Sequence, residues 1–204
     1  MKNIITAGAP LAEAKKLLIM IHGRGAAAQD ILSLSNHLNV DGFALLAPQA
    51  VGNSWYPLSF LAVPKDNEPY LSASLAAISE VVAEAETQGI TRENIYFLGF
   101  SQGACLALEF AARNASRFGG VAAFTGGLVG DQIYIENYSG SFNGTPVFIG
   151  TSNPDFHVPV QRVLDTEKIL KSMGANVTVK VYDNMPHTIV QDEIDLANQL
   201  IFKL

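Results

Sequence analysis

The sequence predicts an α/β fold in which a mostly parallel central sheet is covered by helices on both faces. Short, continuously apolar segments, typical of strands that are buried on both faces, alternate with segments whose apolar residues recur at helical spacing. Strand and helix in alternation are typical of a parallel sheet. The length of 204 residues suits one globular domain, so we expect a single domain over residues 1–204 without a cap domain.

The expected strands are five apolar runs, at 17–21, 43–47, 95–98, 121–124 and 147–149. A sixth segment, 177–182, alternates apolar and polar residues instead. Alternation predicts a strand with one wetter face, which we expect near the edge of the sheet.

The expected helices follow from apolar residues spaced three and four apart. One set is Leu71, Leu75, Ile78, Val82 and Ala85, and another is Val190, Ile194, Ala197, Ile201 and Leu204. Further helices are expected at about 26–38, 102–113 and 160–173. The longest stretch without clear periodicity, 48–69, predicts a functional loop, because loops of that length in compact domains usually have a role.

Composition and charge limit the classes of protein to which the chain can belong. With 49% hydrophobic and 16% charged residues, the chain has the composition of a packed globular protein. A net charge of −6 argues against nucleic-acid binding and fits neutral or apolar substrates better than polyanions. The longest early apolar run, 17–21, is too short for membrane insertion, and Pro10 and Glu13 interrupt any signal-peptide core. Cys105 is the single cysteine, so no intrachain disulfide is possible, and we expect a cytoplasmic protein.

The segment Gly99-Phe100-Ser101-Gln102-Gly103 follows a predicted strand and precedes a predicted helix. In that setting, Gly-x-Ser-x-Gly is typical of a nucleophile elbow. The glycines let strand and helix pass closely, while the sharp turn lifts the serine hydroxyl above the sheet. Ser101 is therefore the expected nucleophile.

The segment His22-Gly23-Arg24-Gly25 ends an early strand. In α/β-hydrolases a loop at this place donates one backbone N–H to the oxyanion. We expect the N–H of Arg24 to be that donor and the N–H of Gln102 to be the second. His22 is interpreted as a structural residue that pins the loop. The Arg24 side chain has two open interpretations: it is solvated, or it meets an acidic part of a substrate.

A serine nucleophile needs a base, and four histidines are present: His22, His37, His157 and His187. His187 follows the last predicted strand through a short loop and precedes the last helix, which is where this fold places its base. His157 is only two residues from Asp155, too close in sequence for the usual acid–base arrangement. His37 is expected to be solvated on a surface helix.

Several aspartates compete for the role of the acid that orients the base. Asp155 follows a predicted strand through a short loop, and Asp183 also follows a strand but is four residues before His187. Asp131 and Asp192 are further candidates. Spacing favours Asp155 only slightly, because an aspartate after a strand is more often a turn former.

The chain resembles the phospholipase/carboxylesterase family, small serine hydrolases that include acyl-protein thioesterases. The matching pieces, in order, are His22-Gly23-Arg24-Gly25, Asn53-Ser54-Trp55-Tyr56, Gly99-Phe100-Ser101-Gln102-Gly103-Ala104, Asp155-x-x-Val158-Pro159 and His187. The resemblance implies a lidless α/β-hydrolase with Ser101, Asp155 and His187 as its triad. The thioesterase branch has His-Gly-Leu-Gly-Asp at the first loop, so Arg24 and Ala26 make this chain more similar to the bacterial carboxylesterase branch.

The expected activity is hydrolysis of short- to medium-chain carboxylic esters through an acyl-serine intermediate, with no metal or organic cofactor. Trp55, Tyr56 and Gly23 are the expected substrate-binding residues, while Phe60 and Leu61 either line the pocket or pack a small core of their own. The alternatives are a lysophospholipase or acyl-thioesterase, and a non-catalytic binding protein on a hydrolase scaffold. The expected partner is a small-molecule ester, and the expected state is a monomer or homodimer.

Overall fold

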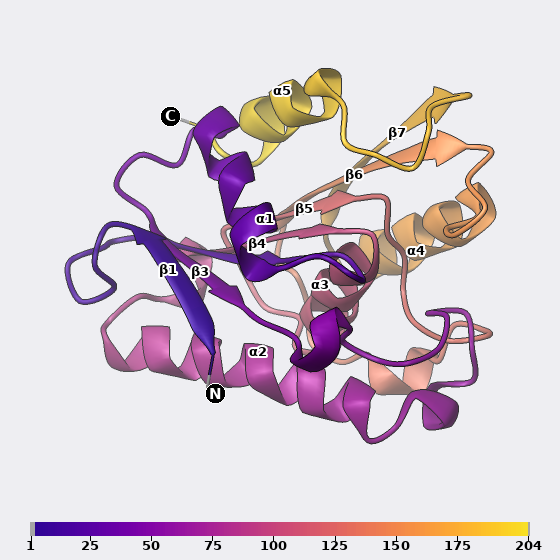
Figure 1. Cartoon of the computed structure of the whole chain (residues 1–204), viewed down its shortest axis with the longest axis horizontal. Coiled ribbons are helices and arrows are strands. Elements are labelled where there is room, and N and C mark those ends of the chain that lie inside the picture. Colours follow the sequence, from indigo (N-terminus) through magenta and orange to yellow (C-terminus); the bar gives the residue numbers. More distant parts are fainter. Residues whose placement is uncertain (1–2, 204) are drawn as a thin grey trace.

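One sheet runs through the molecule, with strand order β1-β3-β2-β4-β5-β6-β7 (Figure 1). The computed structural model describes residues 3–203. The strands are β1 (Ile4–Gly8), β2 (Leu17–Ile21), β3 (Ala44–Pro48), β4 (Ile95–Phe100), β5 (Gly120–Phe124), β6 (Pro146–Asn153) and β7 (Asn176–Asp183). Each neighbouring pair of strands is parallel except β1 and β3, which are antiparallel. The predicted mostly parallel sheet is confirmed, and β7 is an edge strand as expected.

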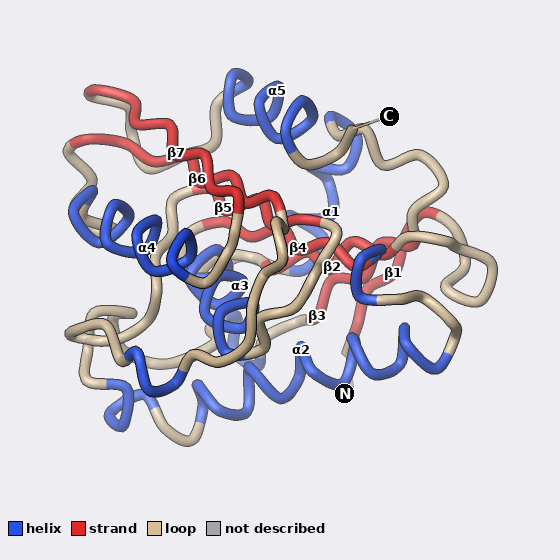
Figure 2. The backbone as a smooth tube through the Cα atoms, turned by 180° about the vertical axis from the view of Figure 1, so that it is seen from behind, coloured by secondary structure: helices blue, strands red, loops and turns tan. Residues whose placement is uncertain are grey.

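Helices cover both faces of the sheet, as Figures 1 and 2 show. They are α1 (Ala28–Leu32), α2 (Tyr70–Thr87), α3 (Gln102–Arg113), α4 (Val160–Ser172) and α5 (Gln191–Leu200). Buried residues of α1 and α5 pack in one apolar core, and those of α2, α3 and α4 pack in a second core on the other face. The central strands contribute side chains alternately to both cores, which explains their continuously apolar sequences.

Apart from shifts of a few residues at strand and helix ends, the structure differs from the prediction in three places. The helix expected at 26–38 is the short α1 followed by a 3₁₀ helix, Ser33–His37, because serine and asparagine side chains compete for the backbone there. The last helix ends at Leu200, and Leu204 lies outside the described residues. Strand β1 was not predicted, because five residues with half-exposed and exposed side chains produce no apolar run.

The loops that follow β2, β4, β6 and β7 leave the sheet at the same edge, because parallel strands share their carboxyl ends. These loops contain His22, Ser101, Asp155 and His187. In open α/β sheets this edge is where ligands bind. The topology therefore brings together four segments that are up to 165 positions apart in the chain.

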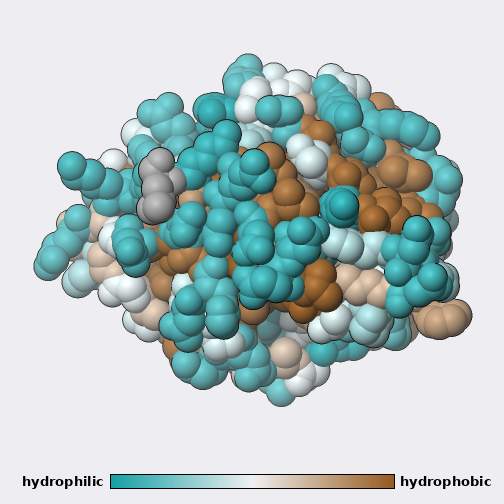
Figure 3. All heavy atoms as spheres, turned by 90° about the horizontal axis from the view of Figure 1, so that it is seen from above, coloured by the Kyte–Doolittle hydropathy of each residue, from teal (hydrophilic) through white to brown (hydrophobic). Residues whose placement is uncertain are grey.

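The surface is mixed in polarity. Figure 3 shows teal polar side chains over most of one face, with brown apolar atoms exposed in patches between them. Within the described part of the chain, none of the helices combines the length and the apolar character needed to span a membrane.

Candidate active site

Ser101 stands at the turn between β4 and α3. Its backbone has φ 54° and ψ −119°, a left-handed conformation that costs a non-glycine residue about 1–3 kcal/mol. The turn is held from two sides: the Ser101 N–H donates to the Phe124 carbonyl at 2.9 Å, and the Ser101 carbonyl accepts from the Cys105 N–H at 3.0 Å. The strained turn therefore fixes the serine at the carboxyl edge of the sheet.

Two glycines allow this close packing of β4, the turn and α3. A Cβ atom on Gly99 would lie 2.4 Å from backbone atoms of Gly103, and one on Gly103 would lie 2.1 Å from the carbonyl oxygen of Ile21. Cβ atoms do not approach other atoms so closely, so any side chain here would force the strands and helix apart. The steric reason predicted for the two glycines is confirmed.

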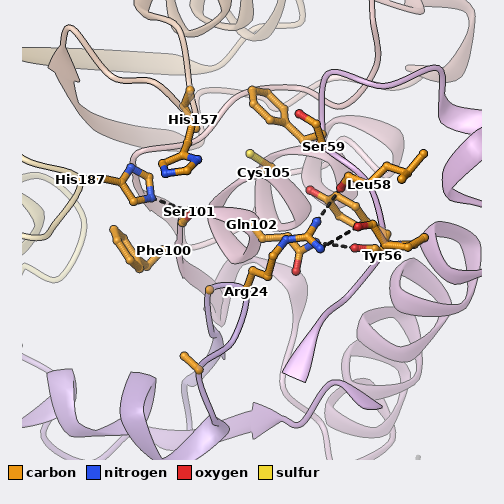
Figure 4. Close-up of a pocket in the computed structure, with 15 residues that line it drawn as sticks. Arg24, Tyr56, Leu58, Ser59, Phe100, Ser101, Gln102, Cys105, His157 and His187 are labelled. Atoms are coloured by element: carbon orange, nitrogen blue, oxygen red, sulfur yellow. Dashed lines mark hydrogen bonds between the residues drawn. The ribbon is translucent and has the colours of Figure 1, made fainter. Parts of the chain in front are cut away.

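The three side chains of the predicted triad form a continuous hydrogen-bonded row. His187 Nε2 lies 2.9 Å from Ser101 Oγ (Figure 4). On the other side of the ring, His187 Nδ1 lies 2.7 Å from Asp155 Oδ2. This geometry lets Nδ1–H donate to the carboxylate while Nε2 accepts from the serine hydroxyl. The arrangement can remove a proton from the serine and stabilise the imidazolium that forms.

The carboxyl group of Asp155 is buried and saturated with hydrogen bonds. Its Oδ1 accepts from the backbone N–H groups of His157 at 2.7 Å and Val158 at 2.8 Å, and its Oδ2 also accepts from Ser152 Oγ at 3.2 Å. Burial raises the pKa of Asp155, but hydrogen bonds from His187 and from the two amides outweigh it, so the pKa lies below its ordinary value. The acid is thus held ionised and in one orientation.

The competing aspartates lie elsewhere. Asp183 is exposed at the end of β7, Asp192 accepts from Tyr182 Oη at 2.7 Å, and Asp131 accepts from Tyr134 Oη at 2.7 Å. None of them is hydrogen-bonded to His187, whereas Asp155 is, so Asp155 stays the candidate for the orienting acid.

The loop after β2 lies directly against the serine. A Cβ atom on Gly23 would lie 3.6 Å from Ser101 Cβ, so the backbone of the loop passes beside the nucleophile. Gly25 adopts φ +80° and donates its N–H to the Asn53 carbonyl at 2.7 Å, which curls the loop. Among the described residues, the N–H groups of Arg24 and Gln102 have no acceptor. Two donors beside the serine are therefore unpaired, one of them at the N-terminus of α3, where the helix dipole favours negative charge.

His22 pins this loop, as predicted. Its Nδ1–H donates to the Gly23 carbonyl at 2.7 Å, and its Nε2 accepts from the Ala50 N–H at 3.2 Å. Burial lowers the pKa of the imidazole, and both of these bonds suit a neutral ring. The side chain is fully buried and does not line the cavity, so it has no access to a substrate.

A cavity of about 410 Å³ opens beside Ser101. It is lined by Gly23, Arg24, Ala26, Tyr56, Pro57, Leu58, Ser59, Phe60, Phe100, Ser101, Gln102, Cys105, His157, Val158 and His187. The size and the largely apolar wall are typical of a small-molecule site. Among residues 3–203, no group of three or more His, Cys, Asp or Glu side chains is arranged to hold a metal ion.

Comparison with known proteins gives the family. The model of the phospholipase/carboxylesterase family matches residues 3–204, which is nearly the whole chain. The chain belongs to the phospholipase/carboxylesterase family. It is therefore an ester hydrolase of the esterase or thioesterase type with the α/β-hydrolase fold, and the resemblance seen in its motifs is confirmed.

Individual relatives span both branches of this phospholipase/carboxylesterase family. The chain is similar to the crystal structure of a phospholipase/carboxylesterase from Dyadobacter fermentans, with 55% identity and a TM-score of 0.98 over 100% of this chain and 97% of the other. It is 32% identical to acyl-protein thioesterase 1 of Saccharomyces cerevisiae over 79% of this chain and 71% of the yeast protein. It is 23% identical to a probable inactive carboxylesterase of Oryza sativa over 74% of this chain and 63% of the rice protein. The chain thus spans less than two thirds of the length of the rice relative.

The loop of residues 54–58 forms one wall of the cavity and is tied to the turn that carries Ser101. The Gln102 side chain accepts from the Trp55 N–H at 3.0 Å and donates to the Tyr56 carbonyl at 2.8 Å. From the other side, Arg24 Nη1 donates to Ser54 Oγ at 3.1 Å and to the Pro57 carbonyl at 2.8 Å. The wall is therefore fixed to both segments that present the unpaired amides.

The predicted substrate-binding residues have different positions. Tyr56 and Gly23 line the cavity, and Phe60 both lines it and packs in the core, whereas Leu61 only packs against the core. The prediction for Trp55 needs correction, because its indole lies behind the cavity wall. Its ring centroid is 4.9 Å from that of His22, and its Nε1–H donates to the His22 carbonyl at 2.8 Å. Trp55 supports the loop after β2 and is not among the described residues that line the cavity.

Some residues of the site were missed in the sequence. His157 lines the cavity with its ring centroid 4.9 Å from that of His187, and Phe100 packs on the other side of His187 at 5.2 Å. His157 was set aside for its closeness to Asp155. Because His157 is only two residues from Asp155, it lies on the same loop beside the cavity, and this proximity in sequence could have identified it as a residue of the site. Cys105 is buried and lines the cavity, and burial raises the pKa of its thiol to about 12.

Proposed function

We propose that the chain is a serine carboxylesterase that hydrolyses short- to medium-chain carboxylic esters through an acyl-serine intermediate. The observation that carries this proposal is the hydrogen-bonded row from Ser101 through His187 to Asp155, beside two unpaired backbone N–H groups. Nucleophile, base, orienting acid and oxyanion donors are the parts that acyl transfer to serine requires.

The reaction begins when His187 Nε2 takes the proton of Ser101 Oγ as the oxygen attacks the ester carbonyl. The tetrahedral oxyanion accepts hydrogen bonds from the N–H groups of Arg24 and Gln102, and removal of one such donor typically costs about 3 kcal/mol of transition-state stabilisation. The imidazolium, stabilised by Asp155, then protonates the leaving alcohol. Water, deprotonated by the same nitrogen, attacks the acyl-serine, and collapse of the second oxyanion releases the acid and restores the serine.

The cavity supports the proposed chain length. Leu58, Phe60 and Val158 supply apolar wall, while buried Tyr56 and Cys105 close the floor. A closed floor stops a long acyl chain from extending in a straight line through the protein. We therefore expect p-nitrophenyl butyrate or hexanoate to be turned over with a higher kcat/KM than the palmitate, and preference for palmitate alone would contradict the proposed chain length.

A fluorophosphonate probe tests the mechanism, because it phosphonylates only a serine with an activated hydroxyl. We expect labelling of the wild type and of Cys105→Ser, and no labelling of Ser101→Ala. A folded wild-type protein that is neither labelled nor active on any nitrophenyl ester would favour the non-catalytic binding protein, an alternative that the rice relative described as inactive keeps in view.

An acyl-thioesterase or lysophospholipase is the second candidate, favoured by the 32% identity to a yeast acyl-protein thioesterase. The triad chemistry is the same for oxygen esters and thioesters, so the distinction depends on the leaving group. Butyryl esters of p-nitrophenol and of thiophenol, and a lysophosphatidylcholine, measured side by side would separate the three activities. The cytoplasmic location and the monomeric or homodimeric state stay predictions, the latter open to light scattering.

A further inference from the structure

The charge of the cavity wall differs from the charge of the whole chain. The chain has 19 acidic residues and a net charge of −6, yet within the described part of the chain no aspartate or glutamate lines the cavity. Arg24 is the permanently charged member of the wall. The negative net charge of the whole chain, from which neutral substrates were expected, therefore does not represent the charge of the cavity wall.

The guanidinium of Arg24 is held by neutral acceptors. Its partners are Ser54 Oγ and the carbonyls of Pro57 and Leu58. These dipoles orient the group but leave its positive charge uncancelled, and among the described residues no carboxylate forms an ion pair with it. Arg24 is exposed, so water and salt screen this charge, and its attraction for an anion is strongest at low ionic strength.

Arg24 also has hydrogen-bond donors left over. A guanidinium has five N–H groups, and the three bonds use both on Nη1 and one on Nη2. The N–H of Nε and one N–H of Nη2 remain. These two nitrogens are bonded to the same carbon, and such a pair matches the two oxygens of a carboxylate.

The position of Arg24 indicates which part of a substrate meets it. Figure 4 shows Ser101 between His187 on one side and the Arg24 side chain on the other. In the proposed mechanism the leaving alcohol is next to His187, so the acyl group extends toward Arg24 and the wall at Leu58. An anionic group within reach of Arg24 therefore belongs to the acyl chain.

We propose that Arg24 selects esters whose acyl chain ends in a carboxylate, that is, half-esters of short dicarboxylic acids. This inference rests on the proposed esterase function and adds its substrate class. Arg24 is a specificity residue in two ways: its side chain binds the terminal carboxylate, and its hold on the loop of residues 54–58 keeps that carboxylate at the right distance from Ser101.

The test compares p-nitrophenyl hydrogen glutarate with p-nitrophenyl methyl glutarate, which has the same acyl chain with its carboxylate methylated. We expect wild type to have a kcat/KM about tenfold higher for the anionic ester at low ionic strength, as for a charge-assisted hydrogen-bonded pair. Arg24→Gln should abolish this preference, and Arg24→Lys should keep part of it. Each ratio is measured within one variant, so a general loss of activity from a loosened loop cancels.

Arg117→Gln is the matched control, because it removes one exposed positive charge at the opposite end of the sheet and should leave the ratio unchanged. An equal ratio in wild type and Arg24→Gln, with the neutral ester still hydrolysed, would overturn the inference about Arg24 alone. If neither ester is hydrolysed and Ser101 resists the fluorophosphonate, the proposed function itself fails.

Discussion

Glu193→Gln is expected to stabilise the protein above neutral pH and to remove a pH dependence from its stability. Glu193 is fully buried in the first turn of α5. Its Oε2 accepts from the Val190 N–H at 3.0 Å, while its Oε1 lies against the Cα of Gly150 without a hydrogen-bond partner. Burial raises the pKa of this carboxyl to about 7, with the negative charge of Asp192 acting in the same direction and the Val190 bond opposing it.

The sign and the size of this pH effect on stability follow from the difference in proton binding between the folded and the unfolded protein. A carboxyl whose pKa is 4.5 in the unfolded chain and about 7 in the folded protein binds more protons when folded. Its contribution to the free energy of unfolding is therefore most favourable below pH 4.5, falls as pH rises to about 7, and is then constant. With a little over 1 kcal/mol for each pKa unit, wild type loses about 2–3 kcal/mol between pH 5 and pH 8 through this group.

Urea unfolding of wild type and Glu193→Gln at pH 5 and pH 8 measures the effect. The variant keeps an oxygen for the Val190 N–H, and the difference between the two proteins cancels other titrating groups, including His22, whose lowered pKa acts with the opposite sign. The stability of the variant relative to wild type should rise by about 2–3 kcal/mol from pH 5 to pH 8. Glu13→Gln, at an exposed position, controls for net charge, and a pH-independent difference for the Glu193 variant would refute the reasoning.

Three further substitutions test the site. Asp155→Asn should lower kcat about 10⁴-fold while the protein stays folded, because the amide favours the wrong imidazole tautomer; retained activity in steady-state assays would contradict its role. Gly103→Ala should destabilise the fold by about 3 kcal/mol or more in urea unfolding, since its Cβ would overlap a β2 carbonyl, whereas normal stability would contradict the packing described. Trp55→Phe should cost about 1–3 kcal/mol by leaving the His22 carbonyl without its donor, while a loss of substrate affinity at full stability would place the indole in the cavity after all.

Much of the fold was readable from the sequence because its central strands are buried on both faces. Each central strand appears in the sequence as an apolar run, and the predicted bounds lie within a few residues of those in the structure. The exception, β1, pairs at the edge of the sheet with side chains that are half-exposed or exposed, so hydrophobicity does not mark it. Its partnership with β3 is a backbone property that side-chain patterns do not encode.

The candidate site was readable where backbone geometry imposes a residue type. Ser101 is flanked by glycines because no side chain fits there, and His187 follows from chain order. Spacing favoured Asp155 over Asp183 only slightly, since both follow strands, and it could not show the turn that directs the Asp155 carboxylate toward His187. Trp55 failed as a substrate residue because its burial depends on contacts made across the fold.

The anchoring of the loop of residues 54–58 has a consequence for the kinetics. Side chains from the β2 loop and from α3 hold it on two sides, and Ser74 of α2 holds it from below through the Trp55 carbonyl at 2.7 Å. Because this loop is held in place, we expect no interfacial activation, in which a lipid–water interface triggers the opening of a site. Progress curves should start without a lag, and the rate should follow the concentration of dissolved monomeric ester, with no jump where that ester begins to form micelles.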